Sequence, residues 1–164
     1  MGDYFAEAPR GDTLSPSQVE VLTELRKMLD ALNPSQVVAE QTRAKVVRRK
    51  ELEIHIPHRG RPDESLMITV DDGDIAISFG YDHLHFDRAQ HSEWLDEALH
   101  FVWDLLRGHL EVEITFKGRV PLKTRVFRVE EDGSRHLIQT LGLLVPFNPF
   151  ARKRVEQHLL SFVA

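Results

Sequence analysis

The sequence predicts an α+β fold, a predominantly antiparallel sheet with helices packed on it, in a single domain. Three observations support this. Asp72-Gly73 stands between two runs of alternating apolar residues, which is the pattern of a tight hairpin. Apolar residues at helical spacing follow over 94–106, and a strict alternation follows over 110–116. The order of elements, with runs of successive strands between the helices, gives a predominantly antiparallel sheet with helices packed on it.

The first part of the chain contains one clear helix and one ambiguous segment. Residues 1–14 are expected to form a flexible tail ahead of a single domain over 15–164. Ser15-Pro16-Ser17-Gln18 predicts a helix start, with serine as the N-cap, proline at the first helical position and glutamine at the capping-box position. Asn33-Pro34 ends this helix. Residues 35–50 fit either a second helix or an early strand.

Alternation predicts the strands that follow. One strand covers 51–57, and the hairpin covers 66–79 around Asp72-Gly73. A helix begins near Arg88 or Glu93 and ends at Arg107, where Gly108 suits the position just past its end.

The last third of the chain predicts three strands and a helix. The strand over 110–116 has one apolar and one polar face, and a further hairpin pairs 123–129 with 136–145. Asn148-Pro149 is expected to start a final helix. Its apolar residues are Val155, Leu159 and Phe162. We expect one shared core to contain Leu95, Leu99, Val102, Val112, Ile114 and Phe116.

Composition indicates a soluble globular protein. Apolar residues make up 41% of the chain and charged residues 29%, and no apolar run approaches the roughly 20 residues of a membrane span. The first residues lack the pattern of a signal peptide. The absence of cysteine excludes disulfides, thiol nucleophiles and thiolate metal sites. We therefore expect a cytoplasmic protein without a membrane partner.

Charge is distributed unevenly along the chain. The segment 43–61 has seven basic and two acidic residues, whereas 71–114 has eleven acidic and two basic residues, so the local balances are +5 and −9. Such asymmetry can steer a charged partner toward the protein. The alternative is a solvated surface whose two halves partly neutralise each other.

The segment Phe79-Gly-Tyr-Asp-His-Leu-His-Phe-Asp87 concentrates polar functional groups at the end of a strand. On one regular strand running on from Ile75, both histidines would face the core. An isolated glycine often marks a bulge, which shifts the alternation by one residue. With a bulge at Gly80, Leu84 and Phe86 point inward while His83 and His85 point outward, which we favour because it buries the apolar groups.

Two histidines at positions i and i+2 on one strand face can bind a metal ion. A third ligand could come from Asp82, Asp87, His91 or His100. The alternative is that both imidazoles make hydrogen bonds at a strand end. Because a lone His-x-His is weak evidence, we expect neither a metal site nor a cofactor.

Other chemical signatures are missing from the sequence. It has neither Gly-x-Ser-x-Gly nor a glycine-rich phosphate loop, and Glu97-x-x-His100 has no second copy to complete a di-iron motif. The basic segment 43–50 lacks interleaved aromatic residues and the chain is acidic overall, which argues against nucleic-acid binding. These observations favour a protein that is not an enzyme.

The run from Asp72 to Asp87, with the helix 94–106 and the strand 110–117, resembles small α+β immunity proteins of bacterial polymorphic toxin systems. Several such families have a core of strand, aromatic-x-His-x-His-Phe, helix and strand. The resemblance covers about residues 66–117. It implies a non-enzymatic protein that neutralises a toxin, and many such toxins are basic nucleases that suit an acidic face. The residues then expected to bind the partner are Tyr81, Asp82, His83, His85, Asp87, Glu93, Asp96 and Glu97.

Three classes of function remain open. The first is an acidic binding protein of the immunity type, which a neighbouring toxin gene would favour. The second is a metal-binding domain or metal-dependent enzyme built on His83 and His85, which bound metal in purified protein would favour. The third is a self-associating scaffold domain, so a homo-oligomer is among the outcomes that a concentration-dependent mass would reveal.

Overall fold

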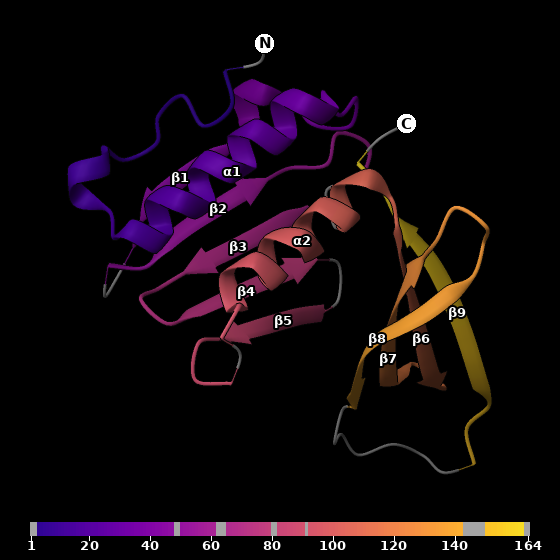
Figure 1. The fold of residues 1–164 in the computed structure, drawn as a ribbon. Coiled ribbons are helices and arrows are strands. Elements are labelled where there is room, and N and C mark those ends of the chain that lie inside the picture. Colours follow the sequence, from indigo (N-terminus) through magenta and orange to yellow (C-terminus); the bar gives the residue numbers. More distant parts are fainter. Residues whose placement is uncertain are drawn as a thin grey trace. The chain divides into compact units, whose positions relative to one another are not determined.

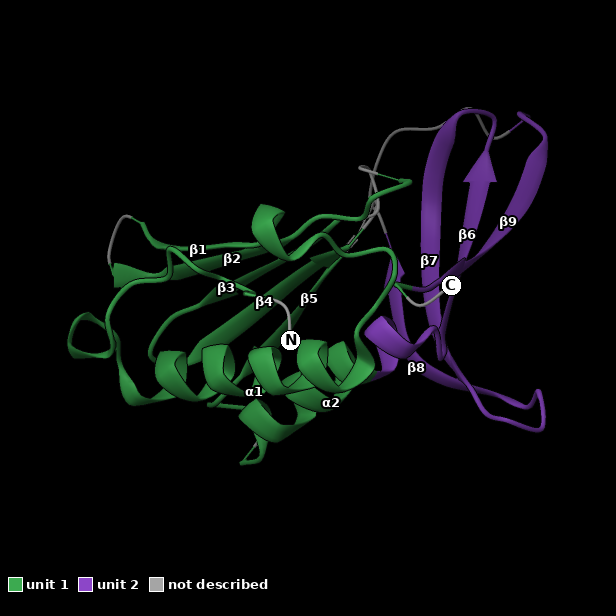
Figure 2. Cartoon of the chain, turned by 90° about the horizontal axis from the view of Figure 1, so that it is seen from above, with its two compact units in different colours: residues 1–103, 162–164 green, residues 104–161 purple. Residues whose placement is uncertain are grey.

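The computed structural model describes residues 3–47, 50–61, 65–79, 82–90, 92–142 and 150–162, without the side chain of Asp82. Within these ranges the chain has two α-helices and two antiparallel sheets, which confirms the α+β fold (Figure 1). It divides into two compact units, which are residues 1–103 with 162–164 (unit 1) and residues 104–161 (unit 2) (Figure 2). The boundary lies within a helix, and the single domain over 15–164 stays a prediction.

Unit 1 contains a five-stranded sheet in sequence order. Its strands are β1 (Arg43–Val46), β2 (Leu52–Ile56), β3 (Leu66–Val70), β4 (Asp74–Phe79) and β5 (Asp82–Asp87). The helix α1 (Pro16–Leu32) and the first part of α2 (Trp94–Arg107) lie on one face of this sheet (Figure 1, Figure 2). Alternate strand residues are buried on that face. One row across all five strands consists of Ala44, Ile54, Ile68, Ile77 and Leu84.

The predicted start and end of the first helix are confirmed. Ser15 and Gln18 form the capping box, and Asn33 ends the helix with a left-handed backbone at φ 42°. Residues 35–50 fit either a helix or a strand, and the described ones, 35–47 and 50, contain a short 3₁₀ turn, η2 (Ala39–Gln41), followed by β1.

The expected flexible tail over 1–14 includes two residues that pack into unit 1. The side chains of Tyr4 and Phe5 are buried. The Phe5 amide donates a hydrogen bond to Thr42 Oγ1 (2.8 Å), and Arg26 Nη2 donates to the Phe5 carbonyl (3.1 Å). These contacts connect the start of the chain to α1 and to the segment before β1. A further 3₁₀ turn, η1 (Gly11–Thr13), leads into α1.

The hairpin predicted over 66–79 is present as β3 and β4. Its turn is held by Asp71, whose Oδ1 accepts hydrogen bonds from the amides of Gly73 (2.8 Å) and Asp74 (2.7 Å). The side chain of Asp71 therefore supplies the hydrogen-bond acceptor for two amides of the turn.

Unit 2 contains the last turn of α2 and a four-stranded sheet in the order β8-β7-β6-β9. The bounds are β6 (Leu110–Lys117), β7 (Val120–Val129), β8 (Arg135–Gly142) and β9 (Lys153–Leu160). The predicted strand over 110–116 and the hairpin after it are confirmed as β6 and as β7 with β8, and residues 143–145 of that hairpin lie outside the described residues. Leu110, Val112 and Ile114 are buried on one face of β6.

The final helix predicted from Asn148-Pro149 is wrong, because the described part of that segment forms β9. Asn148 and Pro149 themselves lie outside the described residues. Val155 and Leu159 have helical spacing, but they are 47% and 52% exposed and form no buried stripe. β9 instead pairs with β6 along its whole length, from Leu110 opposite Leu160 to Lys117 opposite Lys153. This pairing satisfies backbone groups of β6 that a helix would leave open.

The expected core is confirmed in part. Leu99, Val102, Val112 and Ile114 are buried, whereas Leu95 and Phe116 are half-buried. Leu99 and Val102 belong to unit 1, whereas Val112 and Ile114 belong to unit 2.

Gly108 follows α2 as predicted, with φ +77°. A Cβ atom at this position would lie 2.6 Å from Ser161 Oγ. Backbone conformation and packing therefore both require glycine here.

Replacing Ile114 by Asp should lower the free energy of unfolding by roughly 3 to 5 kcal/mol, because it places an unpaired carboxylate in the core of unit 2. Denaturant and thermal unfolding measure the change. Thr115→Asp, on the opposite face of the same strand, is the control and should cost much less. A melting temperature of Ile114→Asp within a degree or two of the parent would contradict the strand assignment.

Burial and the negative charges of Asp30 and Glu40 raise the pKa of the Tyr4 hydroxyl above 10.0. The folded protein therefore holds this proton more tightly than the unfolded chain does. The free energy of unfolding should be highest below about pH 10 and should fall as pH rises through the raised pKa. Tyr4→Phe should weaken this decline in denaturant titrations between pH 9 and 11. Tyr81→Phe removes the other phenol and serves as the control.

Candidate partner-binding surface

His83 and His85 are both exposed, as predicted, but the geometry that places them differs from the prediction. β5 is antiparallel to β4, with Phe79 opposite Asp82, so β5 is a new strand and not a continuation of β4. Leu84 is buried opposite Ile77, and Phe86 is half-buried. The chain reversal between the two strands accounts for this alternation. The bulge predicted at Gly80 and the candidate Tyr81 lie outside the described residues.

The two histidines form a small polar group on the outer face of the sheet. His85 Nδ1 lies 2.7 Å from Asp74 Oδ2 on the neighbouring strand, and both side chains are partly exposed. The rings of His83 and His85 meet edge to face with their centroids 5.4 Å apart. When protonated, His85 forms a charge-assisted hydrogen bond with Asp74, which orients its ring.

Asp87 has a structural role at the end of β5. Its Oδ1 accepts a hydrogen bond from the Ala89 amide (2.7 Å), and its carbonyl accepts one from the Gln90 amide (3.0 Å). Asp87 therefore shapes the turn that follows β5. Its neighbour in the predicted set, Asp82, lies at the start of β5 opposite Phe79.

Glu93, Asp96 and Glu97 are exposed at the start of α2. Asp96 and Glu97 lie in the first helical turn, where negative charge is stabilised by the helix dipole. Among the described residues, Glu93 and Asp96 have no ion-pair partner. Both carboxylates are thus available to a binding partner. Acidic residues are also common at the start of a helix that has no binding role.

The acidity of residues 71–114 is only partly a surface property. At least six of the eleven acidic side chains there accept a hydrogen bond or form an ion pair within the described residues. Asp104, for example, is buried and bonds Arg128 at 2.7 Å. Because Asp104, Glu111 and Glu113 pair with arginines outside this segment, the balance of −9 overstates the charge that a partner would meet. The six are Asp71, Asp74, Asp87, Asp104, Glu111 and Glu113.

In the described part of the chain, no group of three His, Asp or Glu side chains is placed to hold a metal ion. Of the suggested third ligands, His91 and the side chain of Asp82 lie outside that part. Trp94 and Phe101 are core residues, and the ring centroids of Phe101 and Phe79 lie 5.5 Å apart with the ring planes tilted by 45°. Neither described helix is long and apolar enough to cross a membrane.

The outer face of the unit 1 sheet was missed by the sequence reasoning. Residues opposite one another on β1 to β5 form an outward-facing row that ends at His83 and is polar except for Met67. In the sequence, outward-facing residues alternate with the apolar ones along each strand. Only the pairing register of the strands shows which of them lie side by side. The row consists of Arg43, His55, Met67, Ser78 and His83.

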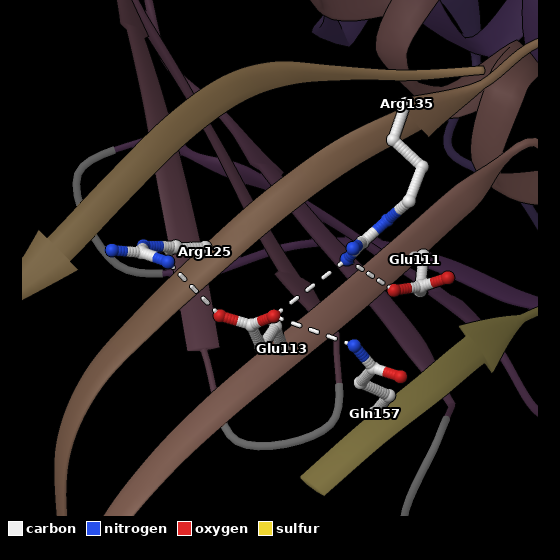
Figure 3. Close-up of polar contacts among 5 residues, drawn as sticks. All are labelled: Glu111, Glu113, Arg125, Arg135 and Gln157. Carbon is white, nitrogen blue, oxygen red and sulfur yellow. Dashed lines mark hydrogen bonds and ion pairs between the residues drawn. The ribbon is translucent and has the colours of Figure 1, made fainter. Parts of the chain in front are cut away.

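Unit 2 has a charged network on the face of its sheet opposite Val112 and Ile114 (Figure 3). Glu113 is its centre and contacts Arg125 Nη1 (3.2 Å), Arg135 Nη2 (3.8 Å) and Gln157 Nε2 (3.4 Å). Arg135 also pairs with Glu111 and lies 4.0 Å from the centroid of the Phe127 ring. Because the charges satisfy each other across β8, β7, β6 and β9, this network stabilises the sheet and offers little free charge.

Comparison of the chain with protein-family models, with curated proteins and with solved structures found no match. The function must therefore be argued from the geometry.

We predict that purified, tag-free protein contains well under one zinc, nickel or iron per chain, because His83 and His85 lack a described third ligand. Elemental analysis by mass spectrometry measures this. A stoichiometric metal that is lost in His83→Ala but kept in His136→Ala would contradict the prediction and would favour the metal-dependent class.

Proposed function

We propose that this chain is a non-enzymatic, cytoplasmic binding protein that holds a basic protein partner around the edge strand β5, with His83 and His85 on the outer face of the sheet and the start of α2 on the opposite face. The observation that supports this most directly is the exposure of Glu93 and Asp96 without ion-pair partners in the described residues. Exposed, unpaired carboxylates raise the association rate of a basic partner.

The histidines give this surface a second kind of contact. His83 and His85 are exposed and ordered by mutual ring contact and by the Asp74 carboxylate. Side chains held in one conformation lose little entropy when a partner binds. They suit the middle of an interface, where contacts control dissociation, while the carboxylates of α2 suit its rim.

The proposal extends to the immunity type, in which the partner is a toxin. The resemblance over residues 66–117 and the acidic carboxylates at the start of α2 support this. Affinity capture from the native host, followed by identification of the bound protein, tests it directly. A basic toxin as the main captured protein would support the immunity role. A mass that rises with protein concentration, with no captured partner, would favour the scaffold class instead.

Once a partner is isolated, Glu93→Lys/Glu97→Lys should slow its association about tenfold at low salt and flatten the salt dependence of the rate, because rim charges act mainly on encounter. Binding kinetics at two salt concentrations measure both effects. Glu130→Lys/Glu131→Lys makes the same charge change on the exposed turn after β7 and is the control. His83→Ala or Tyr81→Ala should instead speed dissociation.

Two results would contradict this surface. The first is that Glu93→Lys/Glu97→Lys leaves the association rate and its salt dependence unchanged. The basic segment Arg43 to Lys50 would then be the next candidate for the binding surface. The other is an equal effect of the control reversals, which would show a general charge effect. Glu97→Lys also removes a favourable helix-dipole contact worth about 1 kcal/mol or less, so thermal melts should accompany the kinetics.

A further inference from the structure

Of the strands that the structure describes, β8 and β9 form the two edges of the unit 2 sheet (Figure 2). An edge strand has a row of backbone N–H and C=O groups that no neighbouring strand satisfies. The pairing of β8 with β7 contains a register shift, an irregularity with which proteins blunt an edge. β9 has eight residues without proline, its pairing with β6 is continuous, and its cations occupy only its first two positions. β9 is therefore the edge better suited to pair with another strand.

One hydrogen bond shows which residues of β9 point their backbone groups away from the sheet. The Gly118 amide donates to the Arg152 carbonyl (2.9 Å), in the same register as the pairs of β6 and β9. Successive residues of a strand point their backbone groups to opposite edges, so the even-numbered residues of β9 point toward β6. The odd-numbered residues Val155, Gln157 and Leu159 therefore point their N–H and C=O groups outward.

The outward-pointing residues also expose apolar side chains. Val155 and Leu159 are about half exposed. Both lie on the sheet face that carries Glu113, with Gln157 between them. A strand edge that combines open backbone groups with exposed apolar side chains is the kind of surface to which another extended strand adds.

The sequence of β9 is complementary to itself in one antiparallel register. When Gln157 of one copy lies opposite Gln157 of a second copy, Val155 lies opposite Leu159 on both sides of the two-fold axis. Glu156 then lies opposite His158, whose ring can donate a hydrogen bond to the carboxylate. This register also brings the outward-pointing residues opposite one another, so that the two copies form about six backbone hydrogen bonds. Backbone, apolar and polar groups thus all favour a second copy as the occupant of this edge.

Other two-fold registers of the same strand fit less well. A centre at Glu156 places two glutamates opposite each other, and like charges in that position destabilise a sheet. A centre at His158 does the same with two histidines. A centre at Val155 leaves residues 158–160 without a partner on β9 of the second copy.

We propose that β9 is a dimer interface, at which two copies of this chain pair β9 with β9 in antiparallel about a two-fold axis at Gln157. The pairing joins the two unit 2 sheets into one and closes at two copies. Each copy contributes a single strand, so the interface is small and its dissociation constant should lie in the micromolar range. The pairing uses none of the residues proposed to bind the basic partner, so the dimer and that function can be tested separately.

Sedimentation equilibrium of the full chain from about 1 to 200 µM measures the dimer. Val155→Lys/Leu159→Lys should raise the dissociation constant at least about tenfold, because each lysine then lies opposite another lysine. Val155→Lys/Leu159→Glu should keep it within about threefold of the parent, because each lysine then lies opposite a glutamate. Leu137→Lys/Ile138→Lys adds two charges to exposed residues of β8 and is the matched control, which should leave the dimer unchanged.

Amide hydrogen exchange measured by NMR gives a second readout that needs no substitution. As the concentration rises through the dissociation constant, the amides of Val155, Gln157 and Leu159 should become protected. The amides of Glu156 and His158 point toward β6 and should show the same protection throughout.

Four results would overturn the proposal. A monomer at every concentration would do so, as would a mass that rises beyond two copies, because two-fold pairing closes. A dimer that the β8 control weakens as much as the β9 lysines do would show a general charge effect. Equal dissociation of Val155→Lys/Leu159→Lys and Val155→Lys/Leu159→Glu would exclude the register about Gln157. Thermal melts check that every variant is folded.

Discussion

The side chain of Gln18 holds three separate parts of unit 1 together. Its oxygen accepts a hydrogen bond from the Ser15 amide (3.0 Å), and its nitrogen donates to the carbonyls of Val70 (3.0 Å) and Lys50 (2.7 Å). A buried amide with these partners is well satisfied. It fixes the start of α1 over the end of β3 and so sets which face of the sheet is covered. Every strand must turn its apolar residues to that face, which leaves His83 and His85 on the other.

The elements that the sequence predicted correctly are those whose signals are local. Ser15 and Gln18 are three residues apart, the turn at Asp72-Gly73 is held by the adjacent Asp71, and Gly108 ends α2 through its own backbone. Each depends on groups within a few residues, so a pattern in the chain is sufficient. The second role of Gln18, which reaches residues 32 and 52 positions away, has no such pattern.

The failures concern pairing between distant segments. Val155 and Leu159 have helical spacing, but β6 needs a partner on its second edge and β9 provides it. The outward position of His83 was predicted for a different reason, since a reversal of the chain and a bulge give the same alternation. The net charge of a segment also depends on partners that are distant in the sequence. Summed along the chain, 71–114 is strongly acidic, yet Asp104 and Glu113 are neutralised by arginines 24 and 12 residues away. Local sums omit such long-range partners.

Gly108 has a consequence for finding relatives of this protein. Because its Cβ would collide with Ser161, the two positions limit each other across a gap of 53 residues. A larger residue at 161 would press on the same turn. In a related chain we expect glycine after the second helix to be accompanied by a small residue just after the last strand. Such a spaced pair is independent of overall identity, and it can select candidates among sequences too divergent to be aligned.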